Sequence, residues 1–418
     1  MKLHWQILIA LVLAVIIGSA SSSLEATFGF SLLPSFDFVG SLFLNALKMI
    51  IVPLIVSSII VGISNIERDG SFARMGGKTL LYYVCTSAIA IMIGLVLVML
   101  IQPGVINGQP AQQVLGLHAD TAAVAERVGG SSGSDIVAIF LRLIPSNVIH
   151  AAAEGQMLGL IFFSLLFGYF IAHCGENSQR TLKGFFQGVF EVMMKITDLV
   201  MRFAPLGVFA LVAAVVARSG LGVFIPLAKF FFTVVAALLL HLLVVLPLLL
   251  KLVAGVSPIK HFRAMAPALL TAFSTSSSAA TLPMTMDCIE KRAGVSNQSS
   301  SFVLPLGATI NMDGTALYEC VAALFIAQAY GLELGMVQQF TVVSLALMTS
   351  IGVAGIPSAS LVAITIILAA MGLPIEGIGL ILAVDRILDM SRTAVNIFSD
   401  SCGAVIIARS EGEETKLV

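Results

Sequence analysis

Long hydrophobic runs, separated by short polar connections, make up most of the chain. They lie at about 5–22, 38–64, 78–102, 135–173, 182–217, 221–255, 295–330 and 375–408. A helix that crosses a bilayer needs about 20 predominantly apolar residues, and longer runs indicate tilted or kinked helices. The pattern therefore predicts an all-α membrane protein with eight transmembrane helices.

Two further segments are apolar at both ends but are interrupted near the middle by small and polar residues. We call them hairpin 1 (258–291) and hairpin 2 (336–372). Non-helical backbone at membrane depth is tolerated only where protein or a ligand satisfies its N–H and C=O groups. We therefore expect two re-entrant hairpins with buried tips. A helix that begins at such a tip presents free N–H groups to an anion.

The Lys and Arg residues of the connections orient these segments. They concentrate on the side of the two termini, which predicts that both termini are cytoplasmic. Hairpin 1 has positive flanks at Lys260 and Lys291 and should enter from the cytoplasm. Hairpin 2, between Glu333 and Glu376, has no positive flank in the sequence and should enter from outside. Opposite orientations indicate inverted repeats, which transporters use to build a site at mid-membrane.

Composition narrows the functional class. The 418 residues are 58% hydrophobic and 11% charged, whereas a soluble domain is roughly 25% charged, so a soluble globular protein is excluded. The net charge of -1 leaves no basic surplus to neutralise a phosphate backbone, which excludes nucleic acid as a partner. The sequence contains neither HExxH nor a P-loop motif, and its five cysteines form no CxxC pair. Neither an enzyme nor a cofactor is expected.

Six polar residues fall on one face of the last predicted helix, within an arc about 100° wide. They are Asp385, Asp389, Arg392, Thr393, Asn396 and Asp400. A charged side chain at the bilayer centre costs at least ~2.5 kcal/mol, so this face should point into the protein. With Asp313 of the seventh helix, four carboxylates oppose only Arg386 and Arg392, a formal charge of -2. Bound cations would balance that charge.

The seventh predicted helix is interrupted at 311–314 by Asn-Met-Asp-Gly. This combination favours an unwound turn that presents carboxylate and carbonyl oxygens, which are the ligands of a hard cation. The third predicted helix adds hydroxyl groups at Tyr83, Thr86 and Ser87. Beside a buried Asp313 they are candidate ligands for a monovalent cation.

Four motifs carry a resemblance to a known family, at 276–283, 311–315, 355–360 and 385–400. In these motifs, and over almost its whole length, the chain resembles the dicarboxylate/amino acid:cation symporters, the glutamate transporter family. The resemblance implies a homotrimer in the lipid bilayer of the inner membrane. It also implies an elevator mechanism, in which a mobile transport domain moves against a central scaffold and hairpin 2 is the extracellular gate.

The same resemblance divides the chain into four parts. Scaffold helices 1 and 2 would occupy 1–77, and helix 3 of the transport domain would occupy 78–103. An external loop and scaffold helices 4 and 5 would occupy 104–217. The remainder of the transport domain would occupy 218–418.

The family's substrate site can be carried over to this chain. Arg392 would pair with the side-chain carboxylate of the substrate, and Asp389 would accept from its α-amino group. Asn396 and the hairpin 1 backbone near Ser278 would hold its α-carboxylate. The implied set is Ser276, Ser277, Ser278, Thr315, Gly355, Ile356, Pro357, Ala359, Asp389, Arg392, Thr393 and Asn396.

The resemblance also implies three sites for sodium as the coupling ion. The first would combine Asp400 with nearby amide and carbonyl oxygens, the second would combine Asp313 with hydroxyl groups of helix 3, and the third would use backbone beneath hairpin 2. The implied ligands are Tyr83, Thr86, Ser87, Gly307, Thr309, Asn311, Asp313, Ser350, Ile351, Val353, Asn396 and Asp400.

Individual positions distinguish the branches of this family. Neutral amino acid carriers lack an arginine at position 392, and C4-dicarboxylate carriers lack the acidic residue at 389. Arg392 and Asp389 together favour L-aspartate or L-glutamate, without deciding between them, and the pair Asp313 and Asp400 favours sodium. A C4-dicarboxylate symporter, a neutral amino acid symporter and a substrate-gated anion channel are the alternatives.

Two positions leave details of coupling open. Glu319 corresponds to the proton-carrying glutamate of animal members, and proton coupling beside sodium is one interpretation; a glutamate hydrogen-bonded within the core is the other. Archaeal members carry an arginine where this chain has Ser276, and animal members carry one where it has Met390. Arg386, close to Met390, is the candidate substitute.

Overall fold

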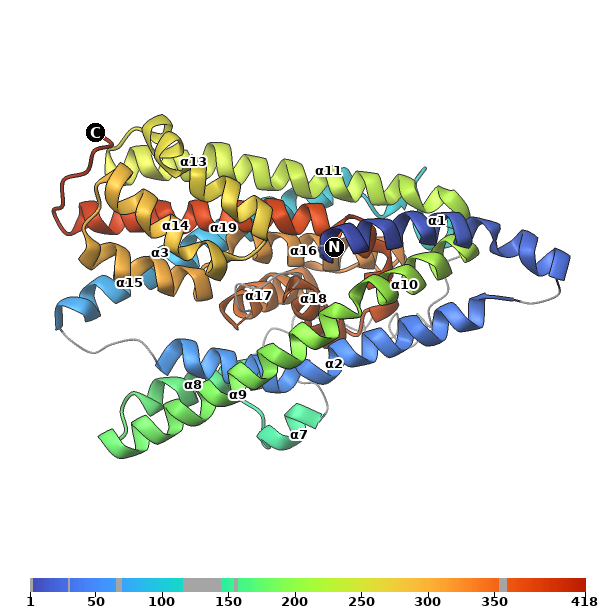
Figure 1. The fold of residues 1–418 in the computed structure, drawn as a ribbon, viewed down its shortest axis with the longest axis horizontal. Coiled ribbons are helices and arrows are strands. Elements are labelled where there is room, and N and C mark those ends of the chain that lie inside the picture. Colours follow the sequence, from blue (N-terminus) through green and yellow to red (C-terminus); the bar gives the residue numbers. More distant parts are fainter. Residues whose placement is uncertain (1–2, 29–30, 65–69, 116–143, 154–156, 353–358) are drawn as a thin grey trace.

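The computed structural model describes residues 3–28, 31–64, 70–115, 144–153, 157–352 and 359–418. Within these residues the chain forms a helical bundle with one short antiparallel pair of strands, β1 (Val105–Ile106) and β2 (Gln109–Pro110). The helices fall into two groups by their packing (Figure 1).

The first group joins the N-terminal helices to those of the middle of the chain. In it, α1 packs on α10, and α2 packs on α8, α9 and α10. Figure 1 shows α2, α8 and α9 along the lower edge of the view. The members are α1 (Leu3–Phe28), α2 (Leu33–Ser64), α7 (Val148–Ala153), α8 (Met157–Ile171), α9 (Glu176–Arg202) and α10 (Ala204–Ser219).

Two residues of α10 explain how this group packs. Pro205 lies in the first turn of α10, directly after a 54° bend between α9 and α10, where its missing N–H is tolerated. Gly207 allows α2 to come close, since a Cβ there would lie 2.2 Å from the ring of Phe43.

The second group surrounds α16 (Asp313–Ala329), which packs on α3, α11, α17, α18 and α19. Every residue of α16 except Gln328 is buried. The other members are α3 (Gly70–Ile101), α4 (Ala111–Leu115), η1 (Gly220–Val223), α11 (Phe224–Leu240), η2 (His241–Val245), α12 (Leu246–Leu249), η3 (Leu250–Ala254), α13 (Pro258–Thr275), α14 (Ser278–Asp287), η4 (Cys288–Ala293), α15 (Asn297–Ile310), α17 (Met336–Gly352), α18 (Ala359–Met371), η5 (Ile375–Gly377) and α19 (Ile378–Ser410). The polar residues of α16 therefore lie inside the protein.

The segment named hairpin 1 is a pair of helices, α13 and α14, that pack against each other. Ser276 joins them in the left-handed region, with φ 53°. Ser277 caps α14, and its side chain accepts from the N–H of Ala280 at 3.2 Å. The short polar tip thus ends one helix and starts the next, as the sequence indicated.

Both ends of this helical pair contact the C-terminal tail. The N–H of Ser257 donates to the carbonyl of Leu417, and the N–H of Lys416 donates to the carbonyl of Ala293, each at 2.9 Å. The two ends therefore lie at the same end of the molecule, beside the C-terminus in Figure 1.

Salt bridges join the start of the same tail to α3. Lys78 contacts Glu411 at 2.6 Å and Arg74 contacts it at 2.5 Å. Hydrogen bonds from Lys78 and Arg74 hold the pKa of the Glu411 carboxyl below its ordinary value.

The segment named hairpin 2 corresponds to α17 and α18, which also pack on each other. Its tip, including Val353, Gly355, Ile356 and Pro357, lies outside the described residues, and for Ile351 and Ala359 only the helical backbone is described. Interactions expected at this tip therefore stay predictions.

Among the described residues, three helical stretches are long and apolar enough to cross a membrane: Arg74–Ile101, Gly220–Ala254 and Asn297–Ala329. The bent pair α9 and α10 is a fourth candidate. The helical content and these stretches fit an all-α membrane protein. The number of eight spans stays a prediction, because part of the run 135–173 lies outside the described residues.

Candidate functional site

The unwound turn expected in the seventh helix is confirmed. α15 ends at Ile310, and α16 begins at Asp313. Between them, Asn311 (φ -98°, ψ 92°) and Met312 (φ -121°, ψ 57°) leave helical geometry. The break puts the Asp313 carboxylate at a helix N-terminus, where the helix dipole favours negative charge.

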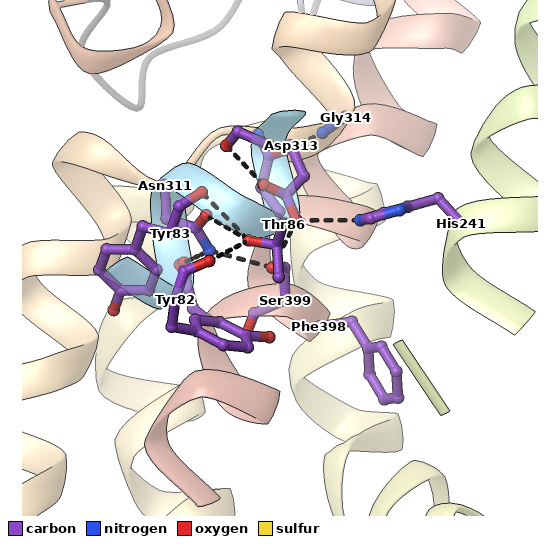
Figure 2. Close-up of polar contacts among 12 residues, drawn as sticks. Tyr82, Tyr83, Thr86, His241, Asn311, Asp313, Gly314, Phe398 and Ser399 are labelled. Carbon is purple, nitrogen blue, oxygen red and sulfur yellow. Dashed lines mark hydrogen bonds and ion pairs between the residues drawn. The ribbon is translucent and has the colours of Figure 1, made fainter. Parts of the chain in front are cut away.

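The Asp313 carboxylate is fully buried and is contacted from three other helical segments (Figure 2). Ser87 Oγ of α3 donates to Oδ1 at 2.6 Å, and Ser399 Oγ of α19 donates to Oδ2 at 2.7 Å. His241 Nε2 of η2 lies 2.9 Å from Oδ2. An ionised carboxylate can only accept, so the histidine donates through its Nε2–H.

Asp400 directly follows Ser399 in α19 and belongs to the same group of polar side chains. Asn311 Nδ2 donates to Asp400 Oδ1 at 2.8 Å and to Ser399 Oγ at 3.0 Å. Gly307 leaves room for this carboxylate, because a Cβ there would lie 2.5 Å from Asp400 Oδ1 and 2.7 Å from the hydroxyl of Tyr83. We call Asp313, Asp400 and these partners the Asp313–Asp400 cluster.

The remaining implied sodium ligands lie at varied distances from this cluster. Thr86 Oγ1 is 3.5 Å from Asn311 Oδ1. Thr309 is exposed and donates to the carbonyl of Leu306 at 2.9 Å. Ser350 is buried and donates to its own helix, α17. In the described part of the chain, no group of three or more His, Cys, Asp or Glu side chains could hold a metal ion. The clustered ligands are mainly hydroxyl and amide groups.

Arg392 is fully buried within α19 and lies between two carboxylates. Its Nη2 donates to Asp389 Oδ1 at 2.8 Å, and its Nη1 donates to Asp385 Oδ1 at 3.3 Å. Cζ lies 3.8 Å from the centre of the Tyr318 ring, a cation–π contact. Arg386 Nη1 is 3.4 Å from Asp389 Oδ2. We call these residues the Arg392 cluster.

The charges of the two clusters differ. In the Arg392 cluster, Asp385 and Asp389 face two arginines and the formal charges cancel. In the Asp313–Asp400 cluster, the two carboxylates face hydroxyl, amide and imidazole groups. With His241 neutral, the excess of two negative charges lies at Asp313 and Asp400.

Three implied substrate residues, Asn396, Thr315 and Thr393, make hydrogen bonds in the region between the Arg392 cluster and the Asp313–Asp400 cluster. Asn396 Oδ1 accepts from the N–H of Gly314 at 2.8 Å, and its Nδ2 donates to Thr315 Oγ1 at 3.1 Å. Thr393 Oγ1 donates to the carbonyl of Asp389 at 2.9 Å. All six residues of the predicted polar face are buried, as expected for a face that does not meet lipid.

Two implied substrate residues carry a buried polar atom without a hydrogen-bond partner among the described residues. They are Ser276, through Oγ at the tip of hairpin 1, and Arg392, through Nε. Ser278 is also buried, in the first turn of α14, which packs on α19. Unpaired buried groups of this kind cost free energy unless a ligand contacts them.

Sequence reasoning missed His241, Tyr318 and Ser399. His241 lies in the core and contacts a carboxylate. One signal was available, because His241 interrupts the apolar run 221–255. Tyr318, whose hydroxyl donates to Asp385 Oδ1 at 2.8 Å, carries no comparable signal.

The chain is similar to known proteins over almost its whole length. Residues 3–410 match the family described as "Sodium:dicarboxylate symporter family". A "Proton/sodium-glutamate symport protein" of Bacillus caldotenax is 36% identical over 412 residues, which cover 98% of this chain and 95% of that protein. A "Proton/glutamate-aspartate symporter" of Escherichia coli is 36% identical, covering 98% and 93%. "Excitatory amino acid transporter 3" of Homo sapiens is 36% identical, covering 99% and 87%. The chain therefore belongs to the sodium:dicarboxylate symporter family.

Proposed function

We propose that this protein is a secondary active symporter that imports L-aspartate or L-glutamate together with sodium. One observation carries the proposal: α19 bears a buried arginine between carboxylates and, further along, a carboxylate whose cluster has no Lys or Arg side chain among the described residues. The names of the relatives, which mention glutamate, aspartate, sodium and protons, support the same activity.

The Arg392 cluster would bind the amino acid. The guanidinium of Arg392 would take the side-chain carboxylate in a two-pronged contact, and Asp389 would then be free to accept from the α-amino group. Asn396 and the N–H groups at the start of α14 would hold the α-carboxylate. The unpaired Ser276 Oγ and Arg392 Nε support this assignment.

The Asp313–Asp400 cluster would bind sodium. A hard cation prefers oxygen ligands, and carboxylate, hydroxyl and amide oxygens converge here from α3, α15, α16 and α19. Sodium would supply the charge that these two buried carboxylates lack, since an unpaired buried charge is strongly destabilising. A third site beneath hairpin 2 would involve Thr309 and Ser350.

Coupling would follow from the shared position of both ligands. Sodium would complete the substrate pocket, so that hairpin 2 closes only when both ligands are bound, and the difference in affinity between states would drive transport. Glu319, buried in α16, would carry a proton as an additional coupling ion.

The architecture would follow the elevator pattern. The first helical group would be the scaffold and trimer interface, and the second group, with α13–α14 and α17–α18 as oppositely oriented re-entrant hairpins, would be the moving domain. Much of the packing of each group lies within that group, which supports this division, although α10 packs on α19 and α2 packs on α17 and α18. In addition, α3 begins at Gly70, before the expected boundary at 78. The protein would cross the cell membrane several times with both termini in the cytoplasm.

Uptake of radiolabelled aspartate and glutamate into proteoliposomes tests the proposal. Sodium, proton and potassium gradients are imposed one at a time. We expect concentrative uptake of both amino acids, or of one, when sodium is directed inward, and no uptake of succinate or alanine. Uptake of succinate would favour a C4-dicarboxylate carrier, and uptake of alanine a neutral amino acid carrier. Current that reverses at the chloride potential, without uptake, would favour a channel.

A further inference from the structure

A buried contact joins Glu319 of α16 to the first helix of hairpin 2. Glu319 is fully buried, and its Oε2 lies 2.7 Å from Thr349 Oγ1 of α17. Its Oε1 has no partner among the described residues. Thr349 is therefore the polar group through which the structure connects Glu319 to hairpin 2.

The Thr349 hydroxyl lies within hydrogen-bond distance of three oxygens. Besides Glu319 Oε2, it is 2.8 Å from the carbonyl oxygen of Leu345 and 3.2 Å from that of Ala346, so Leu345 is the nearer acceptor within α17. A hydroxyl has one hydrogen and can also accept. If Glu319 is ionised, the hydroxyl hydrogen of Thr349 points to the carboxylate, and no hydrogen lies between Thr349 Oγ1 and the carbonyl oxygen of Leu345. If Glu319 is protonated, the carboxyl donates to Thr349 and Thr349 donates to Leu345, so both contacts contain a hydrogen.

The hydroxyl can therefore satisfy Glu319 in both protonation states by rotating. The contact to Leu345 can be released at little cost, because this carbonyl also lies within the helical hydrogen-bond ladder of α17. An ionised carboxylate gains more from a donor than a neutral carboxyl does, because hydrogen bonds to charged groups are stronger. Thr349 thus lowers the free energy of releasing the proton while α17 stays packed on α16.

Few other ionisable groups face Glu319. Three of the helices that pack on α16, namely α17, α18 and α4, contain no Asp, Glu, Lys or Arg. In α3, which also packs on α16, every ionisable residue comes before Ser87. Because Ser87 contacts Asp313 at the start of α16, these residues belong to the part of α3 on the far side of Ser87 from Glu319. Lys229 of α11 donates to the carbonyl of Val105. Within α16 the neighbours are Tyr318 and Cys320. On α19, Arg392 is the charged group that acts on Glu319, and Asp385 and Asp389 balance it.

We propose that Thr349 is a positioning residue for proton coupling, whose rotating hydroxyl lets Glu319 bind and release a proton while hairpin 2 remains packed. This inference rests on the proposed symport function and on Glu319 as its proton carrier. It assigns a role to a residue of hairpin 2 that is not among the implied substrate or sodium ligands.

The test is sodium-driven aspartate uptake by full-length Thr349→Val in proteoliposomes, over external pH values from acidic to alkaline. Valine keeps the shape but cannot donate, so Glu319 should hold its proton more tightly. We expect the alkaline limb of the pH profile to move up by about one pH unit or more, with a slower maximal rate because proton release is hindered. Thr349→Ser, which keeps the hydroxyl, should restore the original profile.

Two controls separate this role from a structural one. Thr365→Val removes a buried hydroxyl of α18 that donates to Leu361 and contacts no carboxyl, and it should leave the pH profile unchanged. In a Glu319→Gln background, Thr349→Val should cause no further shift. An unshifted Thr349→Val profile, an equal shift in Thr349→Ser, or a shift that persists in the Glu319→Gln background would each overturn the proposal.

Infrared difference spectroscopy of the purified protein gives a readout that does not depend on transport. The band of the neutral carboxyl that disappears in Glu319→Gln is followed against pH, and it should persist to higher pH in Thr349→Val. An identical titration in both proteins would overturn the proposal about Thr349. Absence of sodium-driven uptake by the unmodified protein would instead count against the proposed function.

Discussion

Two buried carboxylate clusters share α19 but are stabilised in different ways. The Arg392 cluster pairs Asp385 and Asp389 with guanidinium groups, whereas the Asp313–Asp400 cluster surrounds its carboxylates with hydroxyl, amide and imidazole donors. Buried charges are tolerated when they are paired and hydrogen-bonded. The comparison shows that formal charges cancel in one cluster and do not cancel in the other. We therefore propose that the first exchanges partners with the substrate and that the second takes up cations.

The largest expected effect comes from removing the central charge of the balanced cluster. Arg392→Ala leaves Asp385 and Asp389 without their closest cationic partner and removes the group proposed to bind the substrate's side-chain carboxylate. We expect loss of aspartate and glutamate uptake by more than about 100-fold. The sodium-dependent rise in thermal stability should be retained, because the other cluster is intact. Retained glutamate uptake would contradict our assignment.

Arg392→Lys sharpens this result. Lysine keeps the positive charge but cannot make the two-pronged contact or the same stacking on Tyr318. Uptake should recover only partly, with the deficit mainly in substrate affinity. Full recovery would mean that charge alone, without the guanidinium geometry, selects the substrate.

Removing a negative charge from the Asp313–Asp400 cluster should weaken the sodium dependence of uptake, whereas Arg392→Ala should abolish amino acid uptake and spare sodium binding. Asp313→Asn removes a carboxylate that we propose binds sodium, so half-maximal activation of uptake should require about 100-fold more sodium. Asp198→Asn, at an exposed position of α9, is the matched control and should behave like the unmodified protein. Unchanged sodium dependence in Asp313→Asn would remove this residue from the ion site.

A smaller effect is expected from the histidine that contacts this carboxylate. His241→Leu removes one donor to Asp313 Oδ2 and should lower sodium affinity by roughly 10–100-fold, the usual range for residues that orient a metal ligand. His261→Leu is the control, because this buried histidine contacts Ser401 and, within the described part of the chain, no carboxylate. Sodium titrations of uptake measure both. Equal losses in the two variants would indicate a general packing defect.

The smallest effect should come from Arg386. Its contact with Asp389 is 3.4 Å long, and its side chain is 17% exposed, so the pair contributes little compared with Arg392. Arg386→Gln should reduce aspartate uptake only a few-fold. A loss as large as that of Arg392→Ala would mean that Arg386 replaces the arginine that other family members carry elsewhere in this site.

Local patterns predicted those features that depend on one segment of chain. The helical period placed six polar residues on the buried face of α19, and the Asn-Met-Asp-Gly sequence predicted the break between α15 and α16; both are observed. The polar tip between α13 and α14 was equally readable, because Ser277 is a typical helix-capping residue.

Partners from distant helices could not be predicted in the same way. Periodicity identifies a face but not which residue of another helix meets it, so the contacts of His241 with Asp313 and of Thr349 with Glu319 become visible only in the folded chain. Charge counting gave a formal excess of two negative charges but could not locate it. Its position depends on whether each carboxylate meets a guanidinium or a hydroxyl group.

The continuous helix α19 carries residues of both clusters, and this limits how the proposed substrate and sodium sites can move relative to each other. Asp389 and Asp400 lie eleven residues apart on one helix, a fixed separation of about 16 Å along its axis. If the Arg392 cluster binds the amino acid and Asp400 binds sodium, as we propose, a continuous α19 holds the two sites at this spacing. Any displacement of the helix as a unit would then move both sites together.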